Sequence, residues 1–477
     1  MEIKTDRYKE TARRELANPD TQKFLSFFPL VLSARRTLTL ATLPDPEAAL
    51  ALAAAIRAEV VERLPDLLEE FEKNATANGA RVVWARDSAE ANRYILELAR
   101  EKKVTCVTKG KSMVSEEMGL REELQKAGLE VWESDLGEFI TQLLELPPFH
   151  IIGPAINVPV ERVRDIFMEK AGLTEPTNDP VQLGQAARKF LREKFHRAEM
   201  GITGVNIAVA ETGTLINVEN EGNIRHCKSG PRIQVSVLTL EKLAPTMKDA
   251  VHMLRILCMC ATGQRLGTYA SLDSGPRKAG EMDGPEELHI VILDNGRSAI
   301  HADPETRDAL RCVRCAACLS VCPVYGKIGG YPYGWAYSGP MGQVLNPLLL
   351  GLDRAEDLVW SCTLCQRCKG ACPAGIDHPR MLLYYRSLQA QGSEAFGAGG
   401  AGLAEKALQR LYAVAAGNPG FWKVFATAAR LAANLNERDG KISRMPGPVK
   451  GWFQVRDLPP FPGKTFHDRW KELEREG

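Results

Sequence analysis

Eight of the twelve cysteines in this 477-residue chain lie between positions 312 and 372, in two runs with the same spacing. The first run, RCVRCAACLSVCP, has the pattern C-x2-C-x2-C-x3-C-P, and SCTLCQRCKGACP, which starts 50 residues later, repeats it. Three thiolates two residues apart can bind three corners of a cubane [4Fe-4S] cluster, whereas the fourth corner needs a more distant ligand. The doubled pattern therefore predicts two [4Fe-4S] clusters.

The fourth cysteine of each run is expected to bind the cluster of the other run, because two-cluster ferredoxins are ligated in this way and the following proline turns the chain away. The expected ligand sets are Cys312, Cys315, Cys318 and Cys372 for one cluster and Cys362, Cys365, Cys368 and Cys322 for the other. Structural zinc is the main alternative, but it has no use for a third cysteine two residues away. Arg314, inside the first run, is expected to favour the reduced state of a cluster.

The composition is that of an ordinary globular protein, with 44% hydrophobic and 25% charged residues. The 61 lysines and arginines nearly balance the 60 aspartates and glutamates, so no bulk charge selects nucleic acid. No apolar run reaches the roughly 18 residues of a membrane-spanning helix, and the N-terminus lacks the features of a secretory signal. A cytoplasmic protein is expected, with association at the inner face of the membrane as an alternative.

Four segments are expected. Residues 1–60 should be mainly helical, with a turn at 43–46, and residues 61–300 should form an α/β domain in which β-rich runs alternate with helices. Its expected strands are 81–85, 104–108, 129–134, 205–210, 214–220, 232–238 and 288–293. Residues 301–385 should form a helical di-cluster domain and 386–477 a helical and then extended, proline- and aromatic-rich tail. GAGGAG at 397–402 is interpreted as a linker, because no buried strand precedes it.

Polar stretches follow several of the expected strands, where open α/β sheets bind their ligands. The candidate residues of one ligand cleft, for a carboxylate or phosphate, are Lys109, Lys111, Ser112, Glu211, Thr212 and Thr214. The alternative is that these residues only make turns. Of the cysteines outside the two runs, Cys106, Cys258 and Cys260 are expected in the core, whereas Cys227 could be exposed.

With these pieces in order, the chain resembles the iron-sulfur B protein family of the bacterial lactate-utilization system. The resemblance covers nearly the full length, including AETGTL and LHIVILDNGRS in the α/β domain and IGG and GPMG between the cysteine runs. It implies that the α/β domain is similar to the sugar-isomerase and CoA-transferase fold and that all eight motif cysteines bind clusters. Tyr331, in GGYPYG, departs from the histidine expected in the family.

The resemblance implies an electron-transfer subunit of a multi-protein system that oxidises L-lactate to pyruvate. Its companions would be a cysteine-rich iron-sulfur protein and a smaller protein with a similar α/β domain, and L-lactate is a candidate ligand of this chain. Because no flavin or nicotinamide motif is found, the catalytic residues stay unassigned, and the chemical step is expected on a partner or on an unrecognised cofactor. The alternatives are a subunit for another 2-hydroxy acid such as glycolate, a cluster-based redox sensor, and a scaffold.

Overall fold

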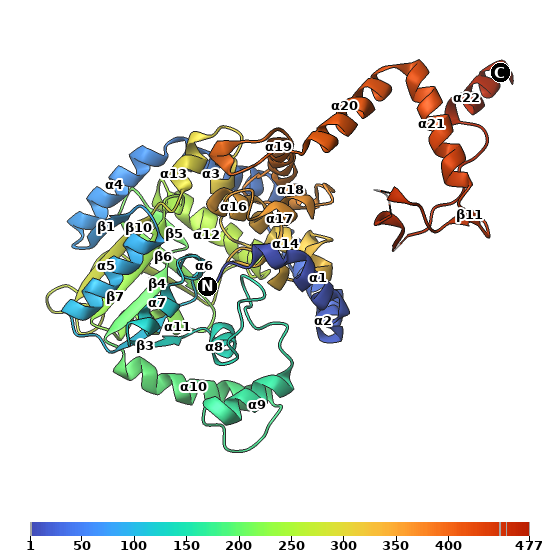
Figure 1. Ribbon diagram of the computed structural model, residues 1–477. Coiled ribbons are helices and arrows are strands. Elements are labelled where there is room, and N and C mark those ends of the chain that lie inside the picture. Colours follow the sequence, from blue (N-terminus) through green and yellow to red (C-terminus); the bar gives the residue numbers. More distant parts are fainter. Residues whose placement is uncertain (1, 448–449, 455, 477) are drawn as a thin grey trace. The chain divides into compact units, whose positions relative to one another are not determined.

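The computed structural model describes residues 2–447, 450–454 and 456–476, and it divides into two compact units. The first unit is Met1–Gly399 and the second is Gly400–Gly477 (Figure 1). The boundary between the units falls within the GAGGAG stretch.

The first unit is built on a six-stranded parallel sheet with the strand order β1-β10-β7-β4-β2-β3. The strands are β1 (Arg81–Ala85), β2 (Cys106–Lys109), β3 (Glu130–Glu133), β4 (Met200–Gly204), β7 (Ile233–Thr239) and β10 (Glu287–Leu293). Every residue of β4 and β7 is buried, as expected of central strands covered on both faces. The parallel α/β sheet predicted from the sequence is confirmed.

Two of the expected strands do not join this sheet. β5 (Ile207–Val209) and β6 (Thr214–Glu219) pair with β8 (Leu243–Ala244) and β9 (Tyr269–Asp273) in a four-stranded sheet with the order β8-β5-β6-β9. The prediction that β5 and β6 complete the parallel sheet is therefore wrong. Their expected place is taken by β4, whose sequence MGITG contains two glycines and so carries little β-propensity.

The parallel sheet shares one of its cores with the cysteine-rich segment. Alternate residues of β10 enter two cores, with Ile290 and Ile292 in one and Val291 and Leu293 in the other. The first core is built with α3 (Pro46–Glu62), α4 (Leu64–Ala77), α13 (Arg297–Ala302), α16 (Gly339–Leu350) and α19 (His378–Gln391), and the second with α5 (Ser88–Glu101) and α7 (Leu120–Lys126). Packing against the sheet thus fixes the position of the cysteine runs.

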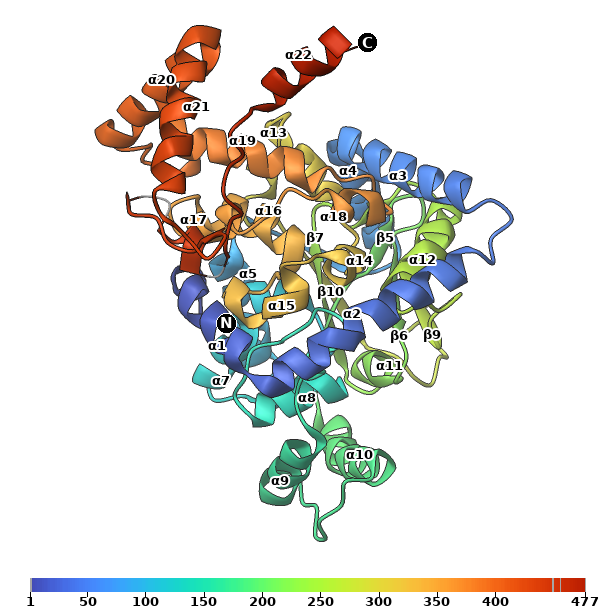
Figure 2. The same cartoon turned by 90° about the vertical axis from the view of Figure 1, so that its right-hand side faces the viewer.

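The N-terminal helices pack on the cysteine-rich segment. α2 (Pro19–Leu40) follows α1 (Tyr8–Ala17) and contacts α12 (Met247–Ala261), α14 (Ala317–Val321) and α15 (Tyr325–Ile328), as Figure 2 shows. The predicted turn at 43–46 separates α2 from α3. Beyond β3, the helices α8 (Leu136–Leu143), α9 (Val160–Lys170) and α10 (Pro180–Arg197) have an apolar core of their own.

The second unit is mainly helical. It contains α20 (Leu403–Gly417), α21 (Pro419–Asn434), the short strands β11 (Glu437–Arg438) and β12 (Lys441–Ile442), and α22 (Phe466–Glu476). The expected extended tail is therefore helical over Phe466–Glu476, and residues 448, 449, 455 and 477 lie outside the described residues. No helix within the described part of the chain is both long and apolar enough to cross a membrane.

Candidate functional site

Cys312, Cys315, Cys318 and Cys372 line one small cavity, which we call the first cysteine site. Three of these thiols come from the first run and one from the second, the grouping that cross-ligation needs. Burial raises the pKa of Cys372 to about 11 and, helped by the charge of neighbouring thiols, raises the pKa of Cys315 well above its ordinary value. Such thiols become thiolates only beside a strong positive charge, and bound iron supplies one.

Cys322, Cys362, Cys365 and Cys368 form a second group, which we call the second cysteine site. Burial, followed by the charges of Cys362 and Cys365, raises the pKa of Cys322 to about 11, and the pKa of Cys368 rises to about 12 through burial and the same neighbours. Cys365 is exposed. Because Cys318 also interacts electrostatically with Cys368, the two sites are neighbours.

Both cysteine runs fold with the same backbone. Arg314 and Ala316 have φ angles of 62° and 60°, and Leu364 and Gln366, at the matching positions, have 56° and 62°. Left-handed residues in a tight turn direct successive N–H groups into a concave anion site, a form that recurs at iron-sulfur centres. The N–H groups of Arg314 and Leu364 donate to the first cysteine sulfur of their own run, at 3.4 and 3.3 Å. The donor set and the turns fit two cubane clusters.

Within the described residues, no group of three or more histidine, cysteine or acidic side chains is placed to hold a single metal ion. A cubane cluster needs a different arrangement from a single ion, because each thiolate binds a different iron and the four cysteine sulfurs lie at separate corners of the cluster.

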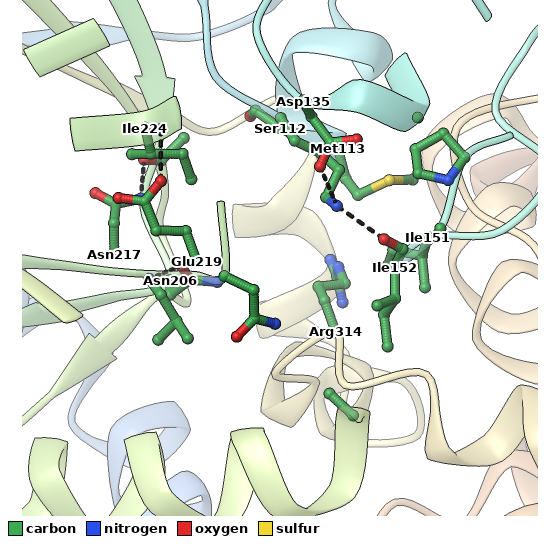
Figure 3. Close-up of a pocket in the computed structure, with 18 of the residues that line it drawn as sticks. Ser112, Met113, Asp135, Ile151, Ile152, Asn206, Asn217, Glu219, Ile224 and Arg314 are labelled. Carbon is green, nitrogen blue, oxygen red and sulfur yellow. Dashed lines mark hydrogen bonds and ion pairs between the residues drawn. The ribbon is translucent and has the colours of Figure 1, made fainter. Parts of the chain in front are cut away.

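A pocket of about 510 Å³ opens at the carboxyl ends of the parallel strands, where open α/β sheets bind ligands (Figure 3). Its lining includes Ser112 after β2, Asp135 after β3 and Thr239 at the end of β7. Arg314 and Tyr337 line both this pocket and the first cysteine site. A ligand in the pocket would therefore be separated from the first cysteine site by single side chains.

The pocket wall carries cations in two different states. The Nζ atom of Lys111 donates to Asp135 Oδ2 at 2.7 Å and to the Ile152 carbonyl at 2.8 Å (Figure 3). Lys242, in contrast, is half-buried, and its side chain has no hydrogen bond or ion pair with any described residue. Burial lowers the pKa of Lys242 to about 8. The positive charge of Lys111 is thus balanced by Asp135, whereas the Lys242 side chain is available to bind a ligand.

Arg314 is held by a buried ion network that reaches back to the sheet. Its Nη2 atom donates to Glu241 Oε1 at 3.2 Å, its guanidinium stacks on Tyr337 with 4.7 Å to the ring centroid, and its buried Nη1 atom has no partner. Glu241 also pairs with Arg297 at 3.2 Å, and Arg297 pairs with Glu117 at 2.7 Å. Although burial opposes it, the two guanidinium groups hold the pKa of Glu241 at about 2.

The six residues predicted for a ligand cleft do not all line this pocket. Lys111 and Ser112 do, and the Ser112 side chain caps α6 (Met113–Glu117) by accepting from the N–H of Ser115. Lys109 is fully buried among the carboxylates of Glu133, Glu116 and Glu138, at 2.9, 3.2 and 3.6 Å.

The other three predicted residues lie at the turn between β5 and β6. Thr212 Oγ1 donates to Thr214 Oγ1 at 2.8 Å, and a carboxylate oxygen of Glu211 accepts from the Met247 N–H at 2.8 Å. None of the three is among the residues that line the pocket. Sequence reasoning missed Lys242, for which no motif gave a signal, and it treated Arg314 only as a charge beside the clusters.

The four cysteines outside the two runs are all buried. Cys227 is fully buried and its Sγ atom donates to Ser134 Oγ at 3.3 Å, so the alternative that it is exposed is wrong. The three other cysteines outside the runs are buried, as predicted.

The Tyr331 hydroxyl donates to Asn157 Oδ1 at 3.4 Å, and its ring packs edge-on against Phe149. Tyr331 therefore has a packing role.

Three family models match successive parts of the chain. They are the LUD domain at residues 68–293, the 4Fe-4S dicluster domain at 308–376, and Lactate utilisation protein B, C-terminal, at 391–475. Together they span the α/β domain, the cysteine runs and the C-terminal unit. A solved structure, the crystal structure of a duf162 family protein from Deinococcus radiodurans, covers 48% of this chain and 98% of its own, with 13% identity and a TM-score of 0.27.

Relatives match over nearly the whole length. The uncharacterized electron transport protein YkgF of Escherichia coli (strain K12) is 39% identical over 477 residues, covering 99% of this chain and 98% of its own. Lactate utilization protein B of Bacillus licheniformis is 39% identical over 478 residues with the same coverage, and that of Bacillus cytotoxicus is 40% identical over 422 residues, or 88% of each chain. This chain belongs to the lactate utilization protein B family.

Proposed function

We propose that this chain is the iron-sulfur electron-transfer subunit of a multi-protein system that oxidises L-lactate to pyruvate. The observation that carries the proposal is the order pocket, first cysteine site, second cysteine site, in which each neighbours the next. When bound, two [4Fe-4S] clusters would supply one-electron carriers for the two electrons that lactate oxidation releases. The full-length likeness to lactate utilization protein B of Bacillus licheniformis supports this substrate.

The eight motif cysteines are the proposed cluster ligands, in the two sets defined above as cysteine sites. The N–H groups of Arg314 and Leu364 donate to cysteine sulfurs and so stabilise the negative charge that a reduced centre gains. Apolar side chains such as Leu319 and Met341 line the first cysteine site and keep water from it.

The partners are proposed to be a cysteine-rich iron-sulfur protein and a smaller protein with a similar α/β domain. The exposure of Cys365 supports electron exchange with a partner at the second cysteine site. For the α/β domain we propose the sugar-isomerase and CoA-transferase type of fold, an assignment supported by its parallel six-stranded sheet.

The test is to purify the chain without oxygen and to measure iron, sulfide and the electron paramagnetic resonance spectrum of the reduced protein. We expect about eight iron and eight sulfide atoms per chain and two interacting [4Fe-4S] signals. The same preparation, mixed with both companions and an electron-accepting dye, should convert L-lactate to pyruvate faster than it oxidises glycolate. Zinc in place of iron, or turnover that does not need this chain, would refute the proposal.

A further inference from the structure

The pocket beside the first cysteine site has two cationic side chains with N–H groups that no described residue accepts from, the Lys242 ammonium and the Nη1 group of Arg314. The Lys242 side chain has no hydrogen bond or ion pair with any described residue. Arg314, whose side chain is 10% exposed, has a buried Nη1 atom with no hydrogen-bond partner in the described part of the chain. A buried N–H group without an acceptor destabilises the protein, and more so when the group is charged. Both side chains can therefore donate hydrogen bonds to a ligand oxygen in the pocket.

The pocket has the place and size of a small-molecule site. Its volume of about 510 Å³ lies within the roughly 300–1,000 Å³ of ordinary ligand pockets, and it lies at the carboxyl edge of the parallel sheet. Figure 3 shows the Arg314 guanidinium facing the open space between Asn206 and Ile152, across from Asp135 and Ser112. A molecule there could reach Arg314 and neutral amide groups together.

The charges of the lining decide which anion fits. The ionisable lining residues are three bases, Lys111, Lys242 and Arg314, and three acids, Asp135, Glu219 and Glu221. Lys111 is paired with Asp135 and Arg314 with Glu241, so Lys242 is the lining base without an ion pair among the described residues, and its charge lies near Arg314 and Cys312 of the first cysteine site. A singly charged carboxylate satisfies that charge, whereas a doubly charged phosphate would also be repelled by the acids opposite.

We propose that this pocket binds a small organic acid whose carboxylate is held by Lys242 and Arg314, so that the rest of the molecule lies next to the first cysteine site. The proposal deepens the proposed function and rests on it for the meaning of the binding, since it names the place where a 2-hydroxy acid or the corresponding 2-oxo acid meets this subunit. Lys242 and Arg314 act as binding residues, and no chemical step is assigned to them.

The test is isothermal titration calorimetry of the full-length, cluster-loaded chain under anaerobic conditions, with L-lactate, pyruvate and inorganic phosphate as separate probes. We expect saturable binding of L-lactate or pyruvate and weaker binding of phosphate. Lys242→Gln should raise the Kd for the acid at least about tenfold, because it removes a charge-assisted hydrogen bond. Lys248→Gln is the matched control, since Lys248 lies six residues further along the chain, beyond β8, is exposed and does not line the pocket.

Arg314→Gln should raise the Kd for the acid to a similar degree. The iron content of this variant is measured first, because Arg314 lies between the proposed cluster ligands Cys312 and Cys315. If Arg314→Gln loses iron, Lys242→Gln decides alone, because Lys242 leaves no protein partner unpaired when it is replaced. The proposal is overturned if neither acid binds the wild-type chain, if phosphate binds as tightly as the acids, or if Lys242→Gln and Lys248→Gln bind alike.

Iron content and reducibility are measured on the same samples, so the two proposals can fail separately. A chain with about eight reducible iron atoms that binds no acid would refute only the pocket assignment. A chain that binds the acid through Lys242 but holds no iron would refute the electron-transfer function and leave the pocket assignment standing.

Discussion

The two cysteine sites have the same spacing and the same backbone turns, yet their surroundings differ. Cys315, the middle cysteine of the first run, is 8% exposed, whereas its counterpart Cys365 is exposed. The first site adjoins the pocket and the buried network of Arg314, Glu241 and Arg297. Near the second site the comparable ion pair, Lys369 with Asp377, lies at the surface. A shared ligand motif therefore leaves the role of each site to the residues that pack around it.

The difference indicates a direction for electrons. The buried site is next to the cavity in which an organic acid is proposed to bind, and the exposed site is where another protein can approach. Under these proposals the first site would face the acid and the second a partner, although the two motifs are equivalent when read alone.

The largest effect should come from removing one ligand at each site. Cys315→Ala and Cys365→Ala should each lower the iron content from about eight to about four atoms per chain and stop electron transfer to the dye. Only Cys315→Ala should also lower the melting temperature markedly, since Cys315 is buried in an apolar core with α12 and strands of the four-stranded sheet, whereas Cys365 is exposed. Iron analysis and thermal unfolding followed by circular dichroism test this. Equal melting temperatures for the two variants would remove the distinction between an inner and an outer site.

The next effect concerns the ion network, which belongs to the first site alone. Arg297→Met should lower the free energy of unfolding by about 3–5 kcal/mol, because Glu117 and Glu241 would remain buried without their shared cation. Arg380→Met is the control, since Arg380 pairs with Glu305 at the surface and should contribute about 0–1 kcal/mol. Anaerobic urea unfolding measures both values. A loss below about 1 kcal/mol for Arg297→Met would show that the network does not anchor the first site.

A smaller, kinetic difference is expected when iron is removed. A ferrous-iron chelator added to the reduced chain should take about four iron atoms several-fold faster than the rest, because the second site is open to solvent at Cys365. Iron release followed by absorbance gives the two phases. The fast phase should be missing in Cys365→Ala and should persist in Cys315→Ala. A single phase in the wild-type chain would mean that both sites are equally accessible.

A single sequence predicts a feature of this structure well only where neighbouring residues in the chain determine that feature. The cysteine runs are local motifs, so their spacing alone predicted the grouping that the first and second sites display. Strand existence was also local, but the sheet to which a strand belongs was not, and β5 and β6 were placed in the wrong one. β4 was missed because two of its five residues are glycine, and only its burial between β2 and β7 makes it a strand.

The ligand pocket was predicted less well, for the same reason. Lys109 looks like an anion-binding lysine after a strand, but Glu116, Glu133 and Glu138 fold around it and leave it no exposed surface. Lys242 lies in a short connection with no motif, and its proposed role rests on a side chain that no other described residue pairs with. Residues that the fold brings close to a lysine decide whether its charge is paired within the protein or available to a ligand. A single sequence does not show which residues these are.

The smallest effect tests whether the two backbone turns are as alike as their φ angles. A left-handed residue other than glycine costs about 1–2 kcal/mol, and glycine costs about 0.5–1 kcal/mol in unfolded-chain entropy. Gln366→Gly should therefore stabilise the chain by up to about 1 kcal/mol, since Gln366 has a left-handed backbone and is exposed. Ala316→Gly should give no gain, because its methyl group is buried in the core and losing it costs about 0.8 kcal/mol. Paired urea unfolding curves measure the difference, and equal shifts would mean that the different burial of the two turns does not change the cost of their left-handed residues.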